Sequence, residues 1–383
     1  MGRHEGMRAC RPLFFLVLFL LIACEAEPPP PFQLQPVAFD RLAGWEDDRH
    51  EEGLAAFRKG CPRLTASPQG EEKWGAVCRQ AAGVPKKDGR AARQFFESAF
   101  TPHRVLGDGK AEGLFTGYYE AELEGSWEKD ARYRFAVYGR PKDLVMVDLG
   151  RFRGEYRGET IAGRVEAGQL RPYSTRSEIA EGALEGKKLE LLWVDDPIDL
   201  FFLHIQGSGR VHMKDGSELR LGYAGKNGHR YRSIGQELIA RGEISKANAS
   251  MPALRAWLRA HPEKMSELLA QNPSFVFFRK QEMEGPIGSL GVALTPGRSL
   301  AVDRAFLPLG APLWLDSVTP LNPEEPLRRL VVAQDTGGAI KGAVRGDFFW
   351  GFGAAAEKQA GSMKVSGRYY LLLPKPGAAT AAN

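Results

Sequence analysis

The chain has 383 residues, of which 43% are hydrophobic and 26% are charged, and its formal net charge is +5. This length is sufficient for two domains, each with a core of its own. No block of Lys or Arg is interleaved with aromatic residues, so the small positive excess does not indicate a nucleic-acid-binding protein and suits a weakly anionic polymer as partner.

The first 23 residues predict an export signal. Three arginines, at positions 3, 8 and 11, form a basic head before an apolar run from residue 13 to residue 22. This run is too short to span a bilayer as a stable anchor. It ends in Leu21-Ile22-Ala23-Cys24, which resembles a bacterial lipobox and predicts that Cys24 becomes the lipidated first residue of the mature protein. The alternative is an ordinary signal peptide that happens to contain a cysteine.

Lipidation at Cys24 would place the protein on a membrane. Glu25 follows the cysteine and resembles the sorting pattern for the outer membrane, so we expect an outer-membrane lipoprotein that faces the periplasm. Two or three acyl chains hold a protein firmly, where one would not. Residues 24–38, with prolines at 28–31, predict a stiff tether between the lipid and the folded body. Loss of residues 1–23 removes three arginines and one glutamate, which lowers the net charge from +5 to +3.

Two cysteines remain for the folded body, Cys61 and Cys78. In an oxidising periplasm we expect them to pair. Closing that loop would stabilise the fold by about 3 kcal/mol on the chain-entropy model. The alternative is a pair of buried free thiols.

The pattern between residues 39 and 100 is helical. Apolar residues recur at helix-like intervals, and the triplets Gly-Cys-Pro at 60–62 and Gly-Val-Pro at 83–85 interrupt them. From residue 114 the pattern changes to short β-rich runs separated by turn residues, which indicates a barrel or a sandwich. The predicted strands of this part are residues 115–119, 135–138, 144–147, 191–194 and 200–205.

One clear helix is predicted inside the β-rich part. Ser250 is its N-cap, Pro252 lies in its first turn and Pro262 ends it. Further strands are predicted at residues 276–278, 300–302, 313–315, 331–333 and 369–373, with a short helix at 354–360. The sequence therefore predicts a mainly β fold with flanking helices.

Several common catalytic arrangements are absent from the sequence. The histidines outside the export signal, at positions 50, 103, 204, 212, 229 and 261, form no His-x-x-x-His pair and no Cys/His cluster, so no metal site is expected. No Gly-x-Ser-x-Gly elbow and no phosphate loop of the Lys-Ser/Thr type occurs. Residues 351–356 match a dinucleotide fingerprint loosely, but no βαβ series surrounds them. We therefore expect neither a metal nor an organic cofactor.

Two aspartates near the C-terminus are candidate acid–base groups. A strand-like run, residues 331–334, delivers Asp335 into a glycine-rich turn, and Asp347 is followed by Phe-Phe-Trp at 348–350. Apolar rings raise the pKa of a nearby carboxylic acid, and a protonated acid is what acid-catalysed cleavage of a sugar chain needs. The alternative is a tight turn whose aspartates cap backbone amides and whose aromatic residues fill the core.

Four polar residues are candidate sugar contacts. Thr116 and Tyr118 flank a flexible glycine and offer a hydroxyl and a stacking face. Gln206 and Ser208 could present an amide and a hydroxyl to acetamido groups. The alternatives are a hairpin edge with core tyrosines for the first pair and a turn for the second.

Eight ordered motifs resemble one family across nearly the whole mature chain, the membrane-bound lytic murein transglycosylase A family. The motifs are FTGYYE at 115–120, IQGSG at 205–209, YRSIG at 231–235, NPSFVFF at 272–278, TPGRSLAVD at 295–303, PLG at 308–310, QDTGGAIKG at 334–342 and RGDFFWGFG at 345–353. Two positions depart from the family pattern: Ala121 stands where proline is expected, and His204 where glutamine is usual.

The resemblance implies a C-terminal domain named for three aspartates, here Asp303, Asp335 and Asp347. It implies a double-psi β-barrel domain with N-terminal helices, built from residues 39–122 and 273–377, with the three-aspartate region at 295–374. A second barrel-like β domain, residues 123–272, would be inserted into it, and a tail would follow at 378–383. The glycan would lie in a groove between the two domains.

The resemblance also implies a reaction: cleavage of the β-1,4 bond between N-acetylmuramic acid and N-acetylglucosamine, leaving a 1,6-anhydro ring. Asp347 would act first as acid and then as base, and cleavage would start from strand ends. Asp335 would orient loop amides or stabilise positive charge at C1. Asp303 would hold a turn or contact substrate, and Lys341 or Arg345 could meet substrate carboxylates. Wall-synthesis proteins are possible partners.

Two other functions remain open at this point. A non-catalytic peptidoglycan-binding lipoprotein could use the same scaffold, because fold alone does not fix function. A hydrolytic glycosidase would also use Asp347, but it needs a second carboxylate and a water molecule.

Overall fold

The computed structural model describes residue 2 and residues 32–156, 159–282 and 285–376. The predicted export signal, the predicted lipidation site Cys24, residues 24–31 of the tether and the predicted tail lie outside the described residues. Within the described ranges, no helix has both the length and the apolar character that crossing a bilayer requires.

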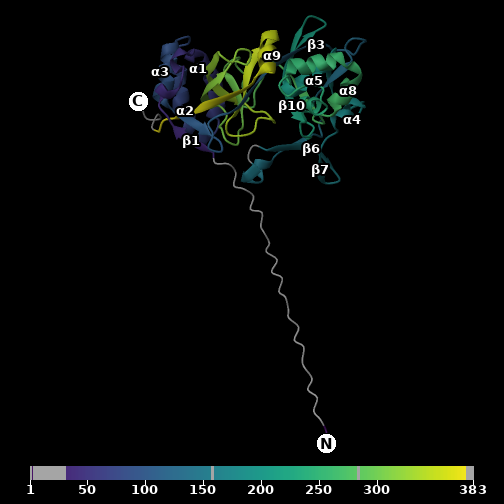
Figure 1. The fold of residues 1–383 in the computed structure, drawn as a ribbon, viewed down its shortest axis with the longest axis horizontal. Helices are drawn as coiled ribbons and strands as arrows, with labels where there is room; N and C mark the ends of the chain where they lie inside the picture. The colour runs from purple at the N-terminus through teal and green to yellow at the C-terminus, as the bar shows by residue number, and fades with distance from the viewer. Residues whose placement is uncertain (1, 3–31, 157–158, 283–284, 377–383) are drawn as a thin grey trace. The chain divides into compact units, whose positions relative to one another are not determined.

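Three helices lie near the start of the described chain, as the pattern between residues 39 and 100 predicts (Figure 1). They are α1 (His50–Leu64), α2 (Pro68–Gly83) and α3 (Gly89–Ala99), preceded by the short 3-10 helices η1 (Phe39–Arg41) and η2 (Trp45–Asp47). Ser67 and Asp88 cap α2 and α3 by accepting hydrogen bonds from backbone N–H groups. Cys61 of α1 and Cys78 of α2, the predicted pair, form a disulfide.

Six strands close into a ring, which we call the first barrel. In order round the ring they are β3 (Gly113–Ser126), β15 (Arg345–Phe352), β12 (Ser299–Val302), β14 (Pro326–Asp335), β13 (Pro312–Val318) and β16 (Lys364–Pro374), which pairs again with β3. The pairs β3–β15 and β12–β14 are parallel and the others antiparallel. Beyond β16, β2 (Phe100–Leu106) and β1 (Gln33–Pro36) extend the sheet. Fully buried Phe115, Trp314 and Phe348 belong to its core, which continues beneath the three N-terminal helices.

A second ring, the second barrel, uses the other end of β3. Its strands are β3, β9 (Ser208–Met213), β10 (Glu218–Lys226), β11 (Val276–Gln281), β4 (Phe135–Tyr138) and β8 (Glu190–Val194). A single bridge between Gly139 and Phe278 joins the end of β4 to β11, and β8 returns to β3. The core contains the buried side chains Leu123, Val211 and Leu221. The prediction of a mainly β fold with flanking helices is confirmed.

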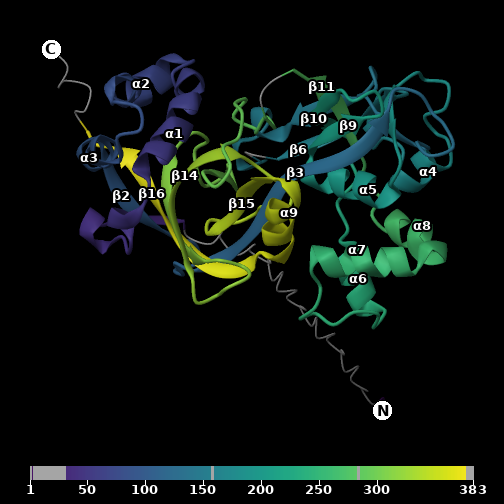
Figure 2. The ribbon, with the colours of Figure 1, turned by 90° about the horizontal axis from the view of Figure 1, so that it is seen from above.

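The strand β3 is shared by both barrels. Residues from Leu114 to Glu120 pair with β15, and residues from Ala121 to Gly125 pair with β9. Figure 2 shows β3 running from the strands of the first barrel toward β9 and β10. A residue near the start of β3 is therefore held in the first barrel, and one near its end in the second.

Helices and a small sheet surround the second barrel. The helices are α4 (Arg176–Ala180), α5 (Pro197–Gln206), α6 (Ile234–Ala240), α7 (Met251–Ala260) and α8 (Pro262–Ala270), and the sheet is β5 (Val145–Asp148), β6 (Thr160–Glu166) and β7 (Gln169–Arg171), with η3 (Leu149–Arg151) and η4 (Gly154–Tyr156) between β5 and β6. Buried Phe201, Leu238 and Trp257 join α5, α6 and α7 into one core. Ser250 caps α7 as predicted, and α9 (Gly353–Ser362) includes the predicted short helix.

One strand prediction is wrong. Residues 200–205 lie in the helix α5 rather than in a strand. Asp196 caps this helix, Pro197 occupies its first turn and Gly207 ends it with a φ of +78°. These signals lie outside the apolar run, and a short buried run alone does not distinguish a strand from a helix. The strand β11 differs from the expected domain boundaries. The inserted domain was expected to end at residue 272, but β11 follows that residue and pairs with β10 in the second barrel.

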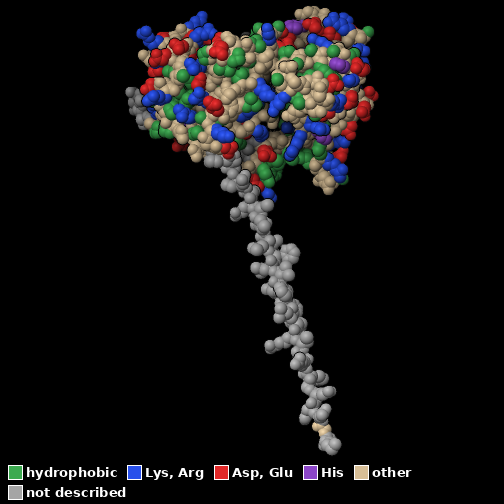
Figure 3. All heavy atoms as spheres, viewed as in Figure 1, with side chains coloured by type: hydrophobic (Ala, Val, Ile, Leu, Met, Phe, Trp, Pro, Cys, Tyr) green, Lys and Arg blue, Asp and Glu red, His purple; other side chains and the backbone are tan. Residues whose placement is uncertain are grey.

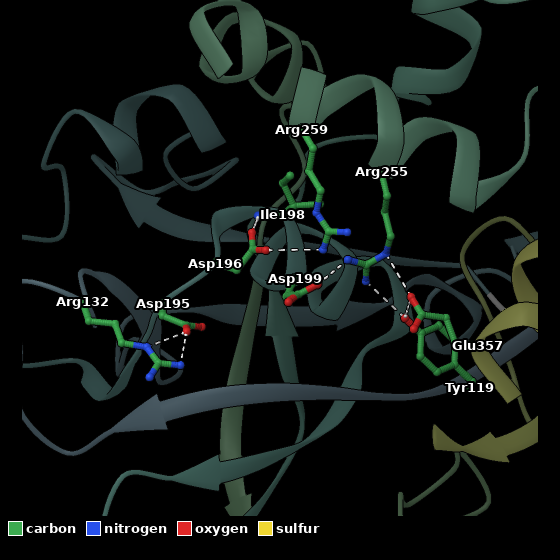
Figure 4. A network of polar contacts seen from close by, with 9 residues as sticks. All are labelled: Tyr119, Arg132, Asp195, Asp196, Ile198, Asp199, Arg255, Arg259 and Glu357. Carbon is green, nitrogen blue, oxygen red and sulfur yellow. Dashed lines mark hydrogen bonds and ion pairs between the residues drawn. The ribbon is translucent and has the colours of Figure 1, made fainter. Parts of the chain in front are cut away.

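Buried and half-buried ion pairs tie these parts together. Arg298, which is 2% exposed, donates to Asp48 and Glu52 and so joins the loop before β12 to the N-terminal helices. Arg255 of α7 contacts a carboxylate on α5, another on α9 and the hydroxyl of Tyr119 (Figure 4). On the face drawn in Figure 3, cationic and anionic side chains are interspersed.

Candidate active site

Four residues lie side by side across four neighbouring strands. Thr116 of β3 pairs with Asp347 of β15, which pairs with Ala301 of β12, and Ala301 also pairs with Asp335 of β14. The two aspartates are thus separated by one strand, whose residue at this point is small. Two interstrand spacings place their backbones about 10 Å apart. The sheet therefore brings together residues that are 231 positions apart in the chain.

Asp347 is half-buried and makes one hydrogen bond among the described residues. The Thr116 hydroxyl donates to its Oδ1 atom at 2.6 Å, and no described group donates to Oδ2. Burial raises the pKa of Asp347 to about 6, against the Thr116 hydrogen bond and the charge of Arg345, which lower it; the charge of Asp335 adds to the rise. The carboxyl group can therefore carry a proton near neutral pH, with one oxygen free to transfer it.

Asp335 has a different environment. Its Oδ1 accepts hydrogen bonds from the backbone N–H and the hydroxyl of Ser289, both at 2.9 Å, and from the N–H of Thr336 at 2.8 Å. Its Oδ2 accepts one from the Tyr118 hydroxyl at 3.2 Å. Burial raises the pKa of Asp335, and these donors oppose the rise because they stabilise the ionised form. The two carboxyl groups thus differ: Asp335 is surrounded by donors, and Asp347 is not.

An apolar wall lies against the two aspartates. The ring centroid of Phe349 is 5.1 Å from that of Tyr118, and both side chains are buried in a cluster with Leu294, Ala301 and Ile340. Of the aromatic run 348–350, Phe349 shares the face of β15 with Asp347, because side chains alternate along a strand. Phe348 points to the opposite face and is fully buried in the first barrel. Apolar side chains on this face contribute to the burial that raises the pKa of Asp347.

The structure places the other predicted residues as follows. Asp303, which is 5% exposed, accepts hydrogen bonds from the N–H groups of Ala305 and Gly342 and so holds the turn after β12. The amide oxygen of Gln206 accepts from the N–H of Tyr119 at 3.2 Å, which joins α5 to β3. Ser208 is half-buried at the start of β9, opposite a glycine of β10.

Lys341 is exposed in the loop between β14 and β15. Burial lowers the pKa of Lys226, at the end of β10, and the nearby charge of Lys341 lowers it further. The positive charge on a loop of the first barrel therefore acts on a lysine of the second barrel. Two surface cavities, of about 480 and 530 Å³, lie beside β13 and β16 and beside the disulfide, and neither is lined by Asp335 or Asp347.

Comparison with known proteins gives the family. Residues 114–279 match the MltA specific insert domain, and residues 298–373 match the 3D domain. The chain is 37% identical over 276 residues to a membrane-bound lytic murein transglycosylase A of Vibrio cholerae, which covers 70% of this chain and 67% of that protein. The chain belongs to the membrane-bound lytic murein transglycosylase A family. The resemblance predicted from the eight motifs is confirmed.

Solved structures of this family have the same fold. A crystal structure of MltA from Neisseria gonorrhoeae has a TM-score of 0.77 and 38% identity, covering 91% of this chain and 96% of that one. A crystal structure of Escherichia coli MltA with bound chitohexaose has a TM-score of 0.67 and 32% identity, covering 90% and 95%. The match to the family's insert domain begins in β3 and ends in β11, and so spans the strands of the second barrel.

Sequence reasoning missed three features of this family member. Ser289 lies 46 residues from Asp335 in a loop without a motif, and nothing in the sequence indicated their contact. Glu120 follows Thr116 and Tyr118 on the same face of β3 and is buried between Arg210 and Arg220. Arg345 could meet a substrate carboxylate or be solvated on sequence grounds alone, and the structure shows instead that its guanidinium donates to oxygens of its own barrel. Among the described residues, no group of His, Cys, Asp and Glu has a metal-binding arrangement.

Proposed function

We propose that the protein is a murein lytic transglycosylase that cleaves the β-1,4 bond between N-acetylmuramic acid and N-acetylglucosamine and leaves a 1,6-anhydromuramyl end. The single observation that carries this proposal is the pair of unlike carboxyl groups: Asp347 with a pKa of about 6 and a free Oδ2, beside an Asp335 surrounded by donors. Family membership supports it, as does the chitohexaose bound to the related E. coli enzyme.

In the proposed mechanism one residue moves both protons. Protonated Asp347 donates from Oδ2 to the glycosidic oxygen as the bond to C1 of the muramyl sugar breaks. The C6 hydroxyl of that sugar then attacks C1, and Asp347, now ionised, accepts the hydroxyl proton. The nucleophile belongs to the same sugar ring as C1. Most of the entropy cost of bringing it to C1 is therefore avoided. The acid is restored and no water is consumed.

Asp335 has a supporting role in this mechanism. As a carboxylate it would stabilise the positive charge that develops at C1. Its charge also raises the pKa of Asp347. Because four donors already occupy its oxygens, Asp335 is poorly suited to activate a water molecule, which favours the transglycosylase over a hydrolytic glycosidase.

We propose that residues of β3 and residues of the second barrel contact the sugars. The hydroxyl hydrogens of Thr116 and Tyr118 are used by the two aspartates, so their oxygens remain as acceptors for sugar hydroxyls. The amide nitrogen of Gln206 can donate to an acetamido carbonyl, because its oxygen is used by β3. Ser208 would hydrogen-bond a neighbouring sugar, and Lys341 would meet the lactyl or peptide carboxylate. Asp303 would hold the loop that carries Lys341, because it accepts a hydrogen bond from the N–H of Gly342 in that loop.

Further parts of the proposal concern the location and the mode of action. The mature protein would be lipidated at Cys24, anchored in the outer membrane and directed into the periplasm, where it would act on glycan strands from their ends. Wall-synthesis proteins are candidate partners.

Mass spectrometry of murein digested by the purified mature protein tests the reaction. Muropeptides with anhydro ends support the proposal, reducing ends support a hydrolytic glycosidase, and bound but uncleaved murein supports a non-catalytic binding protein.

A further inference from the structure

Arg345 occupies an unusual position for a charged residue beside an active site. It lies two residues before Asp347 on β15, so both side chains point to the same face. Its guanidinium donates to the Thr116 hydroxyl oxygen at 2.8 Å, to the Leu114 carbonyl at 3.3 Å and to the Gly346 carbonyl. Every hydrogen bond of this guanidinium within the described chain therefore goes to an uncharged oxygen, and its charge is felt by Asp347 without a direct contact.

The contact with Arg345 favours one direction of the Thr116 hydroxyl. A guanidinium has only donors, so Thr116 must accept from Arg345. A hydroxyl has one hydrogen, and the Thr116 oxygen lies 2.6 Å from Oδ1 of Asp347, so this hydrogen points to that oxygen. The Thr116 oxygen has two lone pairs, so it could also accept from a protonated Oδ1, but the positive charge of Arg345 at this oxygen opposes a second donor. Without Arg345 this opposition is lost and the hydroxyl can turn round.

We propose that Arg345 is a positioning residue: acting through Thr116, it reserves Oδ1 of Asp347 as an acceptor and so keeps the transferable proton on Oδ2. This inference rests on the proposed function, because it concerns the acid of that reaction. It also explains why one oxygen of Asp347 is occupied by the protein while the other is left to the substrate.

Charge and orientation have separable effects at this site. The charged or titratable groups that face Asp347 are Arg345 of β15, Asp335 of β14 and Tyr118 of β3, and the strand between the aspartates presents Ala301. The positive charge of Arg345 lowers the pKa of Asp347, so its removal raises that pKa and moves the alkaline limb of the pH–rate profile to higher pH. Loss of orientation lowers kcat at the optimum instead.

A double-mutant cycle tests the proposal on the full mature protein, with release of anhydro-muropeptides from murein as the assay. We expect Arg345→Met to lower kcat by about 10- to 100-fold with little change in KM, because misplacing a reacting group costs on this scale. Thr116→Val should cause a similar loss, and Thr116→Ser, which keeps the hydroxyl, should not. The double variant should be no slower than Thr116→Val alone, because the two residues act through one hydrogen bond.

Several outcomes would overturn the proposal. A kcat of Arg345→Met equal to that of the wild type would do so, as would losses that multiply in the double variant. Arg345→Leu also removes the donor and serves if the Met variant does not fold: its kcat should fall as in Arg345→Met, and unchanged kcat contradicts positioning. Arg41→Met, at a position 78% exposed on its side chain, controls for loss of an arginine. A wild-type protein that releases no anhydro ends would instead defeat the proposed function.

Discussion

The Thr116 hydroxyl donates a 2.6 Å hydrogen bond to Oδ1 of Asp347 across two parallel strands of the first barrel. This contact leaves Oδ2 as the oxygen available for a substrate, and it joins the start of β3 to the C-terminal domain of the family. The chemistry of the site is therefore divided between a strand that both barrels share and a strand of the first barrel alone.

Replacement of Asp347 by asparagine tests its role as acid and base. We expect Asp347→Asn to reduce release of anhydro-muropeptides by about 100-fold or more, because an amide cannot donate the proton that a carboxylic acid supplies. Binding to insoluble murein, measured by co-sedimentation, should persist. Asp40→Asn, the same change at an exposed position, is the matched control and should leave turnover unchanged. Turnover near the wild-type value in Asp347→Asn would remove the residue from the mechanism.

The pH dependence of the reaction follows from the raised pKa of Asp347. The active form is protonated, so activity should fall as pH rises above about 6. Asp335 raises this pKa by its charge, so Asp335→Asn should move the alkaline limb to lower pH, in the direction opposite to Arg345→Met. The measurement is kcat/KM against pH for the three proteins. Limbs that coincide in all three would mean that another group sets the profile.

The raised pKa of Asp347 also predicts a stability effect. The folded state binds the proton of Asp347 more tightly than the unfolded state, so this group lowers stability as pH rises from about 4 to about 6. Asp347→Asn lacks this dependence. Its free energy of unfolding at pH 7 should exceed that of the wild type by about 2–3 kcal/mol. The excess should vanish near pH 4. Urea unfolding at both pH values measures it, and an equal difference at the two would contradict the assignment.

The buried ion pair of Arg298 should be required for folding stability. Arg298→Met leaves Asp48, which is 5% exposed on its side chain, without its ion-pair partner, whereas Glu52 keeps Arg49. Breaking a buried pair on one side costs about 3–5 kcal/mol. Arg49→Met removes an exposed arginine, 70% exposed on its side chain, from the same Glu52 and should cost less than about 1 kcal/mol. Urea unfolding of both variants compares them, and similar losses would show that burial does not decide the cost.

The sequence identified candidate residues of the site more readily than their arrangement. The aspartates and the Thr116 motif could be found because short motifs surround each of them. The position of Ala301 between Asp335 and Asp347 could not be predicted from the sequence. It depends on the register of β12 against β14 on one side and β15 on the other. Ser289 was missed for a similar reason: it reaches Asp335 from a loop, and loops carry no periodic pattern.

The misassigned helix has a more general reason. Residues 200–205 are apolar and short, and an apolar run reports burial rather than backbone type. The residues that indicate a helix are Asp196, Pro197 and Gly207, which cap or begin it and lie outside the apolar run. Arg345 shows a second limit of sequence-based prediction. Its spacing of two residues from Asp347 can be read from the sequence, but its hydrogen bond to Thr116 cannot, because Thr116 lies on a neighbouring strand.

The sharing of β3 has a consequence for the substrate path. This strand is a single 14-residue element with ladder partners in both barrels, and its partner changes from β15 to β9 between Glu120 and Ala121. At about 3.3 Å per residue, Glu124 lies about 26 Å along the strand from Thr116. One continuous strand therefore connects the carboxyl group of Asp347 with the outer face of the second barrel, and a polysaccharide that lies along β3 would extend from Asp347 to residues of the second barrel.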